Sequence, residues 1–253
     1  MNEKNILEKF LSTDLASTRQ VFAPFRKIEN AVYFPKTNKD SEIECGDFIY
    51  IPGRRNDRVL LVAHADTVFF KNGKHQIILE NGIYRSGEQD EMTGIGADDR
   101  AGCAILYLLK DSGHSLLVLN GEELGSVAAC TIQAKHKELY DELNNHQYMI
   151  EFDRRNASDY KVYNLPVSQE FKNFIEEKTG YKEADKSSST DITILCSKIC
   201  GVNLSIGYYD EHSPDEILVY KEWKHTLDIV RKMLEEPQKK FPLTTALKGD
   251  LTC

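Results

Sequence analysis

Five short patches of the chain carry side chains that can bind divalent metal ions. They occur in the order His64-Ala65-Asp66, Asp98-Asp99, Glu122-Glu123, Asp153 and His212. Zinc binds imidazole nitrogen and carboxylate oxygen, and a site with few protein ligands per ion stays open for catalysis. Two ions about 3.5–4 Å apart can bind both an attacking water and a carbonyl oxygen. The set is therefore typical of a catalytic two-metal centre.

Apolar runs place three of these patches at the ends of strands. Residues 59–63 have the density of a buried parallel strand, and His64 follows directly. The run 115–120 leads into Glu122-Glu123, and the run 148–152 leads into Asp153. In open α/β sheets, ligand sites form at the carboxyl ends of the strands. We therefore expect these three patches to meet in one pocket.

Asp98 is expected to reach the same pocket from a loop. The loop 94–102 is spaced by glycines, which let a backbone pass close to a bound ion, and residues 103–109 predict a buried helix. Either Asp98 or Asp99 could reach the metals. Asp99 could instead face away from the ions or pair with Arg100.

In order and spacing, the patches resemble the co-catalytic di-zinc peptidases and amidohydrolases of the M20, M28 and M42 families. The family pattern begins with His-x-Asp and an Asp that is followed four residues later by Gly. It continues with Glu-Glu, a lone Asp and a late His, and this sequence matches every step over roughly residues 58 to 234. The resemblance implies a zinc-exopeptidase-like α/β fold, with three α/β/α layers around a mixed, mostly parallel central sheet.

The resemblance also implies a set of metal ligands. His64 and Asp153 are expected to hold one zinc ion, and Glu123 and His212 the other, with Asp98 as the bridge between them. Relatives often have a cis peptide bond just after the bridging Asp. The cofactor implied is thus a pair of divalent ions, with Zn²⁺ favoured.

Three further carboxylates receive roles from the same resemblance. Asp66 is expected to hydrogen-bond the ring of His64 and fix its tautomer. Glu122 is the expected general base, which takes a proton from a metal-bound water and delivers it to the leaving amine. The segment 187–191 resembles a loop near the substrate, which makes Asp191 a candidate substrate-binding residue. A polar turn that caps the next strand fits this segment equally well.

Each patch taken alone has an ordinary structural explanation. Paired glutamates usually mark a solvated helix face, and a histidine at a strand end is usually a satisfied core residue. Glu151 competes with Asp153 as a ligand, and the residues after His212 could simply begin a helix. The fixed order of all five patches favours the metal centre over these alternatives.

The rest of the chain predicts one catalytic domain over residues 1–253. The other predicted elements are helices at 3–11 and 15–25 within an N-terminal segment 1–28, strands at 31–34 and 47–51, a hairpin at 75–85 around Asn81-Gly82, a helix at 168–179 and a closing helix at 221–235. The tail 237–253 has no clear periodicity and is expected to be partly mobile. The gaps 66–98 and 153–212 are too short for the lid or dimerisation domain of some relatives, so the site should be open and a monomer is compatible with the sequence.

Composition limits the classes of partner. The net charge of −8 argues against nucleic acid or an anionic membrane. The N-terminus lacks the order of a signal peptide, and no stretch approaches the 18 apolar residues needed to cross a bilayer, so we expect a cytoplasmic protein. The six cysteines include no C-x-x-C pair, and several lie in apolar contexts typical of buried free thiols. The histidines without companions at ligand spacing are expected at the surface: His75, His114, His136, His146 and His225.

These observations favour a zinc-dependent metallopeptidase that cleaves small peptides, in particular an aminopeptidase. An N-acyl amino-acid amidohydrolase or a carboxypeptidase is the alternative, since Arg100, Arg154 or Arg155 could bind a substrate carboxylate. A non-catalytic binding module on the same scaffold is the alternative from another class, because a fold alone does not imply activity.

Overall fold

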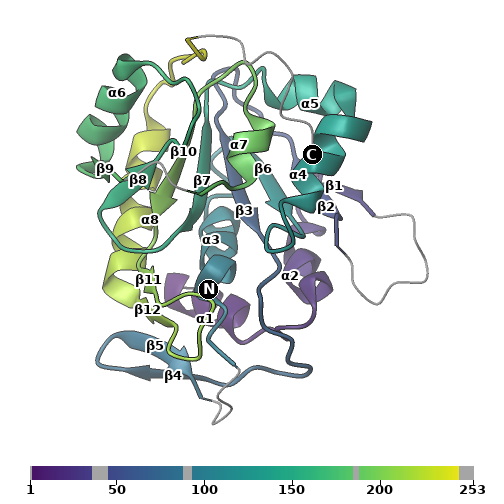
Figure 1. Ribbon diagram of the computed structural model, residues 1–253, viewed down its shortest axis with the longest axis vertical. Coiled ribbons are helices and arrows are strands. Elements are labelled where there is room, and N and C mark those ends of the chain that lie inside the picture. Colours follow the sequence, from purple (N-terminus) through teal and green to yellow (C-terminus); the bar gives the residue numbers. More distant parts are fainter. Residues whose placement is uncertain (1, 36–44, 88–92, 185–187, 245–253) are drawn as a thin grey trace.

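The computed structural model describes residues 2–35, 45–87, 93–184 and 188–244 (Figure 1). An eight-stranded sheet with the order β1-β2-β6-β3-β7-β10-β8-β9 forms its centre. The strands are β1 (Val32–Phe34), β2 (Phe48–Ile51), β3 (Leu60–His64), β6 (Ser115–Leu119), β7 (Met149–Arg154), β8 (Asp159–Lys161), β9 (Lys182–Glu183) and β10 (Gly201–Ser205). Strands β6, β3, β7 and β10 are parallel, whereas β1, β2 and β8 pair antiparallel with their neighbours in the centre. The predicted mixed, mostly parallel sheet is confirmed.

The central strands form where the apolar runs predict them. Every residue of β3 and β6 is buried, as expected for parallel strands covered on both faces. In the register of the sheet, His64 pairs with Leu119 and Val62 pairs with Glu151. The carboxyl ends of β3, β6 and β7 therefore lie at the same edge of the sheet.

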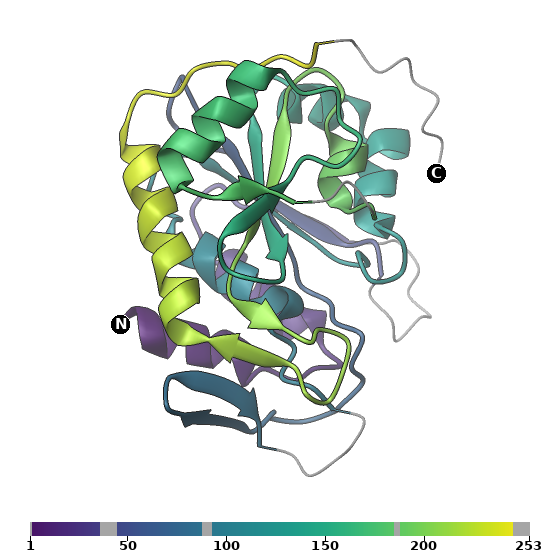
Figure 2. The same cartoon turned by 60° about the vertical axis from the view of Figure 1, so that its left-hand side comes forward.

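Helices cover both faces of this sheet, which gives the three layers (Figure 2). They are α1 (Glu3–Leu11), α2 (Thr18–Phe25), α3 (Ala97–Leu108), α4 (Val127–Lys135), α5 (Lys137–Leu143), α6 (Gln169–Thr179), α7 (Asp191–Leu195) and α8 (Tyr220–Glu235). Helix α3 packs on β3 and β7, with α1 and α2 against it, while α4, α5 and α7 form a group on the other face. Within the described ranges, no helix is long and apolar enough to span a membrane.

A second, four-stranded sheet lies beside the first and has the order β11-β12-β5-β4. It joins the predicted hairpin, β4 (Ile77–Glu80) and β5 (Ile83–Ser86), to β11 (Tyr208–Tyr209) and β12 (Ile217–Val219). Asn81 and Gly82 form the turn with φ angles of 51° and 81°, which Asn and Gly tolerate best. The gap 66–98 thus supplies a hairpin, and His212 lies in the connection between β11 and β12.

Helix α2 begins three residues later than predicted, at Thr18 instead of residue 15. The reason is Arg100, whose fully buried guanidinium donates to the carbonyl oxygens of Thr13 (2.8 Å), Asp14 (2.9 Å) and Leu15 (3.1 Å). Residues 15–16 form a turn, in which the backbone nitrogen of Ser17 donates to the carbonyl oxygen of Asp14 (3.1 Å), and the helix begins only after it. Arg100 therefore binds backbone, and the alternative in which it pairs with Asp99 was wrong.

The first part of the tail, residues 237–244, packs against the rest of the chain, which the sequence pattern did not predict. Phe241 is 3% exposed, and its ring lies 5.1 Å from that of Phe171 and 4.9 Å from that of Phe174. Its backbone nitrogen donates to Gln147 and its carbonyl accepts from Cys200. An irregular segment can bury its side chains without periodicity, which is why the pattern missed it. Residues 245–253 lie outside the described residues.

Candidate metal centre

The strand ends bring four of the predicted residues to one place. His64 is the last residue of β3, Asp153 is the fifth residue of β7, and Glu122 and Glu123 lie in the turn that begins after Leu119, the last residue of β6. The side chain of His64 is only 1% exposed. The expectation that these strand ends meet is confirmed.

Asp98 joins them from the start of α3, where the backbone is not yet helical. Its φ and ψ angles are −77° and 103°, and the peptide bond between Asp98 and Asp99 is cis. Gly102, four residues after Asp98, passes close to other backbone. A Cβ atom there would lie 2.2 Å from Oδ1 of Asp99 and 2.3 Å from the carbonyl oxygen of Phe152. Only glycine fits this position, which explains the spacing of the loop.

One group of contacts centres on His64. Its Nε2 lies 3.1 Å from Oδ1 of Asp98 and 3.4 Å from Oδ1 of Asp153. The Asp153 carboxylate is held in turn by Thr190, whose hydroxyl donates to Oδ2 (2.9 Å), and by Tyr208, whose hydroxyl donates to Oδ1 (3.3 Å). Sequence reasoning missed Thr190 and Tyr208 as partners of Asp153, although Thr190 lies in the segment 187–191 that resembles a loop near the substrate.

A second group of contacts centres on His212. Its Nε2 lies 3.2 Å from Oδ2 of Asp98 and 3.0 Å from Oε2 of Glu123. The two oxygens of Asp98 therefore face two different histidines. The φ angle of His212 is 61°, in the left-handed region that a residue other than glycine adopts rarely and at a cost.

Buried histidine and aspartate side chains in this cluster could hold a metal ion. Ligand atoms of His64, Asp98 and Glu123 all lie within 4.8 Å of one another, and so do those of His64, Asp99 and Asp153. The second grouping is the weaker one, because backbone nitrogens already occupy both oxygens of Asp99. Oδ2 accepts from His64 (3.1 Å) and Oδ1 accepts from Gly102 (3.0 Å). Asp98 is therefore the better candidate for a bridge.

Asp66 links the end of β3 to the turn after β6. Its Oδ1 lies 3.4 Å from Nδ1 of His64, on the opposite side of the ring from Asp98. The same carboxylate accepts from the backbone nitrogens of Gly121 (2.7 Å), Glu122 (3.3 Å) and Glu123 (3.2 Å). It thereby fixes the turn that carries both glutamates, whereas Nδ1 of His64 lies close to Asp66 without a hydrogen bond.

Glu122 faces a cavity of about 520 Å³ that is also lined by Asp98, Asp153 and His212. In the absence of a cation, burial raises the pKa of Glu122 to about 9, and the charge of Asp153 adds to the effect. A carboxyl group thus lies on the same cavity as three of the candidate ligands. A bound cation would oppose the rise in pKa, because positive charge favours the ionised carboxylate.

The electrostatics of the cluster show crowded negative charge. Burial, reinforced by Asp98, raises the pKa of Asp153 to about 6. Hydrogen bonds to Asp98 and Glu123 raise the pKa of His212 to about 11. Burial works against the charge of Asp98, but hydrogen bonds from His212 and His64 hold its pKa below the ordinary value. Without a metal ion, protons on Asp153 and His212 reduce the negative charge of the cluster. A bound metal ion could offset the same charge in their place.

Asp191 lies behind the cavity rather than on its wall. It begins α7, its side chain is buried, and its neighbour Thr190 lines the cavity in its place. Burial raises the pKa of Asp191 to about 7. The structure therefore does not bring Asp191 to the cavity surface, although the segment that contains it does contribute to the wall.

Glu216 holds the loop that carries Asp98. Its buried carboxylate accepts from the backbone nitrogens of Gly96 (2.7 Å) and Asp98 (3.0 Å). The contact joins residues 118 positions apart, so local patterns could not reveal it. The spacing of Glu216 four residues after His212 was the only signal in the sequence.

Replacing Glu216 with Ala should weaken zinc binding by about 10–100-fold, because partners behind a metal ligand typically have effects of this size. The measurement is competition for zinc with a chromophoric chelator. Asp215→Ala is the matched control, since Asp215 is adjacent and exposed. A folded Glu216→Ala protein with the zinc affinity of the parent would contradict this role.

Known structures match the chain over most of its length. No protein-family model matches the sequence, and no curated protein matches it either. The aminopeptidase PepT from Bacillus cereus ATCC 10987 matches with a TM-score of 0.67 and 14% identity, over 93% of this chain and 98% of that chain. A TET aminopeptidase from the marine sediment archaeon Thaumarchaeota archaeon SCGC AB-539-E09 matches with a TM-score of 0.66 and 11% identity, over 93% and 97%.

A tripeptidase from Staphylococcus aureus subsp. aureus Mu50 matches with a TM-score of 0.65 and 13% identity, over 93% of this chain and 98% of that one. The chain has the fold of these peptidases. The predicted zinc-exopeptidase-like fold is therefore confirmed, whereas identities this low carry no information about substrate.

Three of the histidines predicted at the surface are in fact buried: His75, His114 and His146. Nδ1 of His114 accepts from the backbone nitrogen of Val59 (2.9 Å), and Nε2 of His146 lies 2.7 Å from the hydroxyl of Ser115. Burial lowers the pKa of His146 to about 4. Neutral imidazoles here satisfy buried polar groups, which residue spacing alone could not show.

Proposed function

We propose that the chain is a di-zinc aminopeptidase that cleaves small peptides. The observation that carries the proposal is the pair of ligand groups that share Asp98, with Glu122 on the same cavity. His64, Asp98 and Asp153 would hold one ion, and His212, Asp98 and Glu123 the other. The fold matches of this chain are to structures named as aminopeptidases and a tripeptidase, which agrees with this class of reaction.

The donor set fits zinc. Each group offers one imidazole nitrogen and carboxylate oxygens, which are ligands that zinc prefers, and leaves room for further ligands from the solvent or the substrate. Nitrogen and oxygen atoms in each group already lie 3.0–3.4 Å apart. Zinc bound there would acidify a water molecule and polarise the carbonyl group of the scissile bond.

The protein's own residues would then move the proton. Glu122 lies beside the ligand Glu123 and faces the cavity, so its carboxylate can take a proton from the attacking water and pass it to the leaving amine. Asp66 would keep Nδ1 of His64 protonated and Nε2 free to ligate. Thr190 and Tyr208 would hold Asp153 in its ligating orientation.

The contacts of Arg100, Arg154 and Arg155 argue against a carboxypeptidase or a deacylase, which would need a cation for the substrate carboxylate. Arg100 is buried and bound to backbone carbonyls. Arg154 lies in a two-fold contact with Asp159 (2.8 and 3.1 Å), and Arg155 pairs with Glu211 (2.9 Å). Each guanidinium that could have bound a substrate carboxylate beside the reacting bond already has an acceptor in the protein, which favours the aminopeptidase.

The test is hydrolysis of a panel of free tripeptides, N-acetylated tripeptides and N-acyl amino acids, before and after treatment with a chelator. We expect cleavage of the free tripeptides only, from the N-terminal end, with loss of activity on chelation and recovery with zinc. Cleavage of N-acyl amino acids in preference to free peptides would support the amidohydrolase. No cleavage of any substrate by zinc-loaded protein would support a binding module.

Metal-free protein should lose stability as pH rises from about 5 to 9. The raised pKa values of Glu122 (about 9) and Asp153 (about 6) mean that the folded chain holds protons that the unfolded chain has released. The free energy of unfolding therefore falls through this range. The raised pKa of His212, about 11, acts in the same direction above its ordinary value.

Zinc needs deprotonated ligands, so its stabilising effect should have the opposite dependence and grow with pH. The measurement is the Tm of chelated and zinc-loaded protein at pH 5.5, 7.0 and 8.5. We expect the difference between the two forms to be largest at pH 8.5. A difference that is constant or shrinks with pH would contradict the assignment of these residues.

A further inference from the structure

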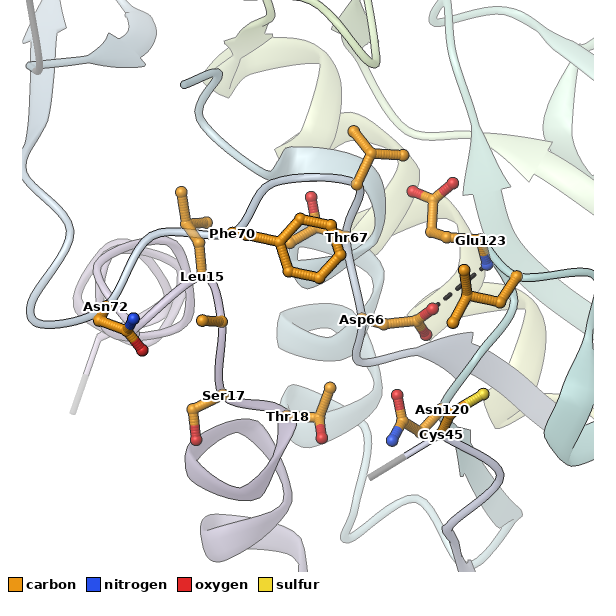
Figure 3. Close-up of a pocket in the computed structure, with 13 residues that line it drawn as sticks. Leu15, Ser17, Thr18, Cys45, Asp66, Thr67, Phe70, Asn72, Asn120 and Glu123 are labelled. Carbon is orange, nitrogen blue, oxygen red and sulfur yellow. Dashed lines mark hydrogen bonds between the residues drawn. The ribbon is translucent and has the colours of Figure 1, made fainter. Parts of the chain in front are cut away.

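A second cavity of about 410 Å³ adjoins the cluster on the side of Glu123 (Figure 3). Asp66 and Glu123 lie at one end of this side pocket, and Leu15 and Asn72 lie at the other. Its surface is mainly apolar, in contrast to the cavity that contains Glu122. The pocket is thus an apolar hollow that opens directly beside a candidate metal ligand.

Two exposed apolar side chains border the side pocket. Phe70 is 77% exposed and Leu124 is 58% exposed, and both line it. Among the described residues, only Val32 and Ile78 are other large hydrophobic side chains of comparable exposure. Single exposed apolar residues need no explanation, but two around one hollow at a reactive centre indicate a surface that a ligand covers.

The part of the side-pocket wall that contains Leu15 is fixed to the loop that carries Asp98. Leu15 packs toward Gly96, where a Cβ atom would lie 2.7 Å from the Leu15 side chain. Arg100, two residues after Asp98, holds the carbonyl oxygen of Leu15 and those of the two preceding residues. The backbone nitrogen of Ala16 donates to Lys71 (3.0 Å), which ties the wall to the loop that carries Phe70. The pocket is therefore preformed and does not need a ligand to assemble it.

The two cavities differ in the charge of the side chains that line them. The side pocket has Asp66 and Glu123 at one end, and none of the described residues that line it is cationic. The cavity on the other side of the cluster carries Arg154, Arg155 and Lys161 in its walls. Arg154 and Arg155 are already paired with Asp159 and Glu211, so the acidic end of the side pocket is the feature that favours the ammonium end of a peptide, its N-terminal residue, in that pocket.

We infer that the side pocket binds the side chain of an apolar N-terminal residue, with the rest of the peptide extending across the cluster into the polar cavity. Phe70 and Leu124 are then the residues that set the preference for that side chain. The inference rests on the proposed aminopeptidase function and adds the class of substrate to it. A leucine or a similar aliphatic residue matches the chemistry of the lining.

The test compares kcat/KM for the tripeptides Leu-Ala-Ala, Ala-Ala-Ala, Lys-Ala-Ala and Ala-Leu-Ala with zinc-loaded protein. We expect Leu-Ala-Ala to exceed Ala-Ala-Ala by about 10-fold or more, because even one methylene group in an apolar pocket is worth about 10–200-fold. Phe70→Ala and Leu124→Ala should each reduce this ratio several-fold. Ile78→Ala, which removes another exposed apolar side chain, on β4 and away from the side pocket, should leave the ratio unchanged.

Three results would overturn the inference while leaving the aminopeptidase intact. They are a preference for Lys-Ala-Ala, a preference that follows leucine at the second position, and a Leu-to-Ala ratio that neither Phe70→Ala nor Leu124→Ala changes. Failure to cleave any of the four peptides would instead contradict the proposed function itself. Because Phe70 and Leu124 are exposed, both variants should fold, and their melting curves provide the check.

Discussion

Glu122→Gln should reduce kcat for peptide hydrolysis by about 10²–10⁴-fold, which is the usual contribution of a positioned general base. Glutamine keeps the size of the side chain but cannot take up the proton. Glu122 lines the cavity together with Asp98, Asp153 and His212, and its backbone is fixed by Asp66, so the substitution should not disturb the cluster. Steady-state kinetics with a tripeptide substrate provide the measurement.

Metal content separates this role from a loss of zinc. The Glu122→Gln protein should retain the same number of zinc ions per chain as the parent, because Glu122 is placed beside the ligands and not among them. Glu138→Gln, an exposed glutamate in α5, is the matched control and should be fully active. A Glu122→Gln protein with normal zinc content and undiminished kcat would rule out Glu122 as the general base.

Asp98→Asn should remove both metal ions together. Oδ1 of Asp98 faces His64 and Oδ2 faces His212, so the side chain belongs to both ligand groups. An amide supplies one neutral oxygen in place of two charged ones. We expect the affinity for zinc to fall by more than the 10–100-fold typical of residues behind a ligand, and activity to fall with it. Zinc titration followed by kinetics measures both effects.

Asp99→Asn is the comparison that decides which of the two adjacent aspartates forms the bridge. Both oxygens of Asp99 accept backbone hydrogen bonds, so its amide would turn an NH₂ group toward one backbone N–H. The expected result is a lower Tm with zinc still bound. If Asp99→Asn loses both ions and Asp98→Asn keeps them, the bridge has been assigned to the wrong residue.

Much of the fold and of the cluster could be predicted because the signals are local. The runs before His64, Glu122 and Asp153 are short and apolar, and in a parallel sheet their carboxyl ends must meet at one edge. The spacing of Gly102, four residues after Asp98, is visible in the sequence, and the structure gives its steric reason, since the backbone of Phe152 leaves no room for a Cβ atom. The order of the patches along the chain was therefore enough to predict that most of the candidate metal ligands meet at one edge of the sheet.

The partners behind the cluster could not be predicted, because long-range packing determines them. Glu216 reaches the Asp98 loop from the connection between β11 and β12, and Tyr208 reaches Asp153 from β11. The late start of α2 has the same origin, since Arg100 takes the carbonyl of Leu15 out of a helix. Buried polar groups must find partners wherever the fold supplies them, and a sequence pattern does not contain that information.

The most direct test of the central claim is the metal content of the purified protein, measured by mass spectrometry together with peptide hydrolysis as zinc is removed and restored. We expect two zinc ions per folded chain. Hydrolysis of free tripeptides should disappear when they are removed and return as the second ion is restored. Zinc-free protein that cleaves peptides at full rate, or protein that binds no zinc at neutral pH, would contradict the central claim.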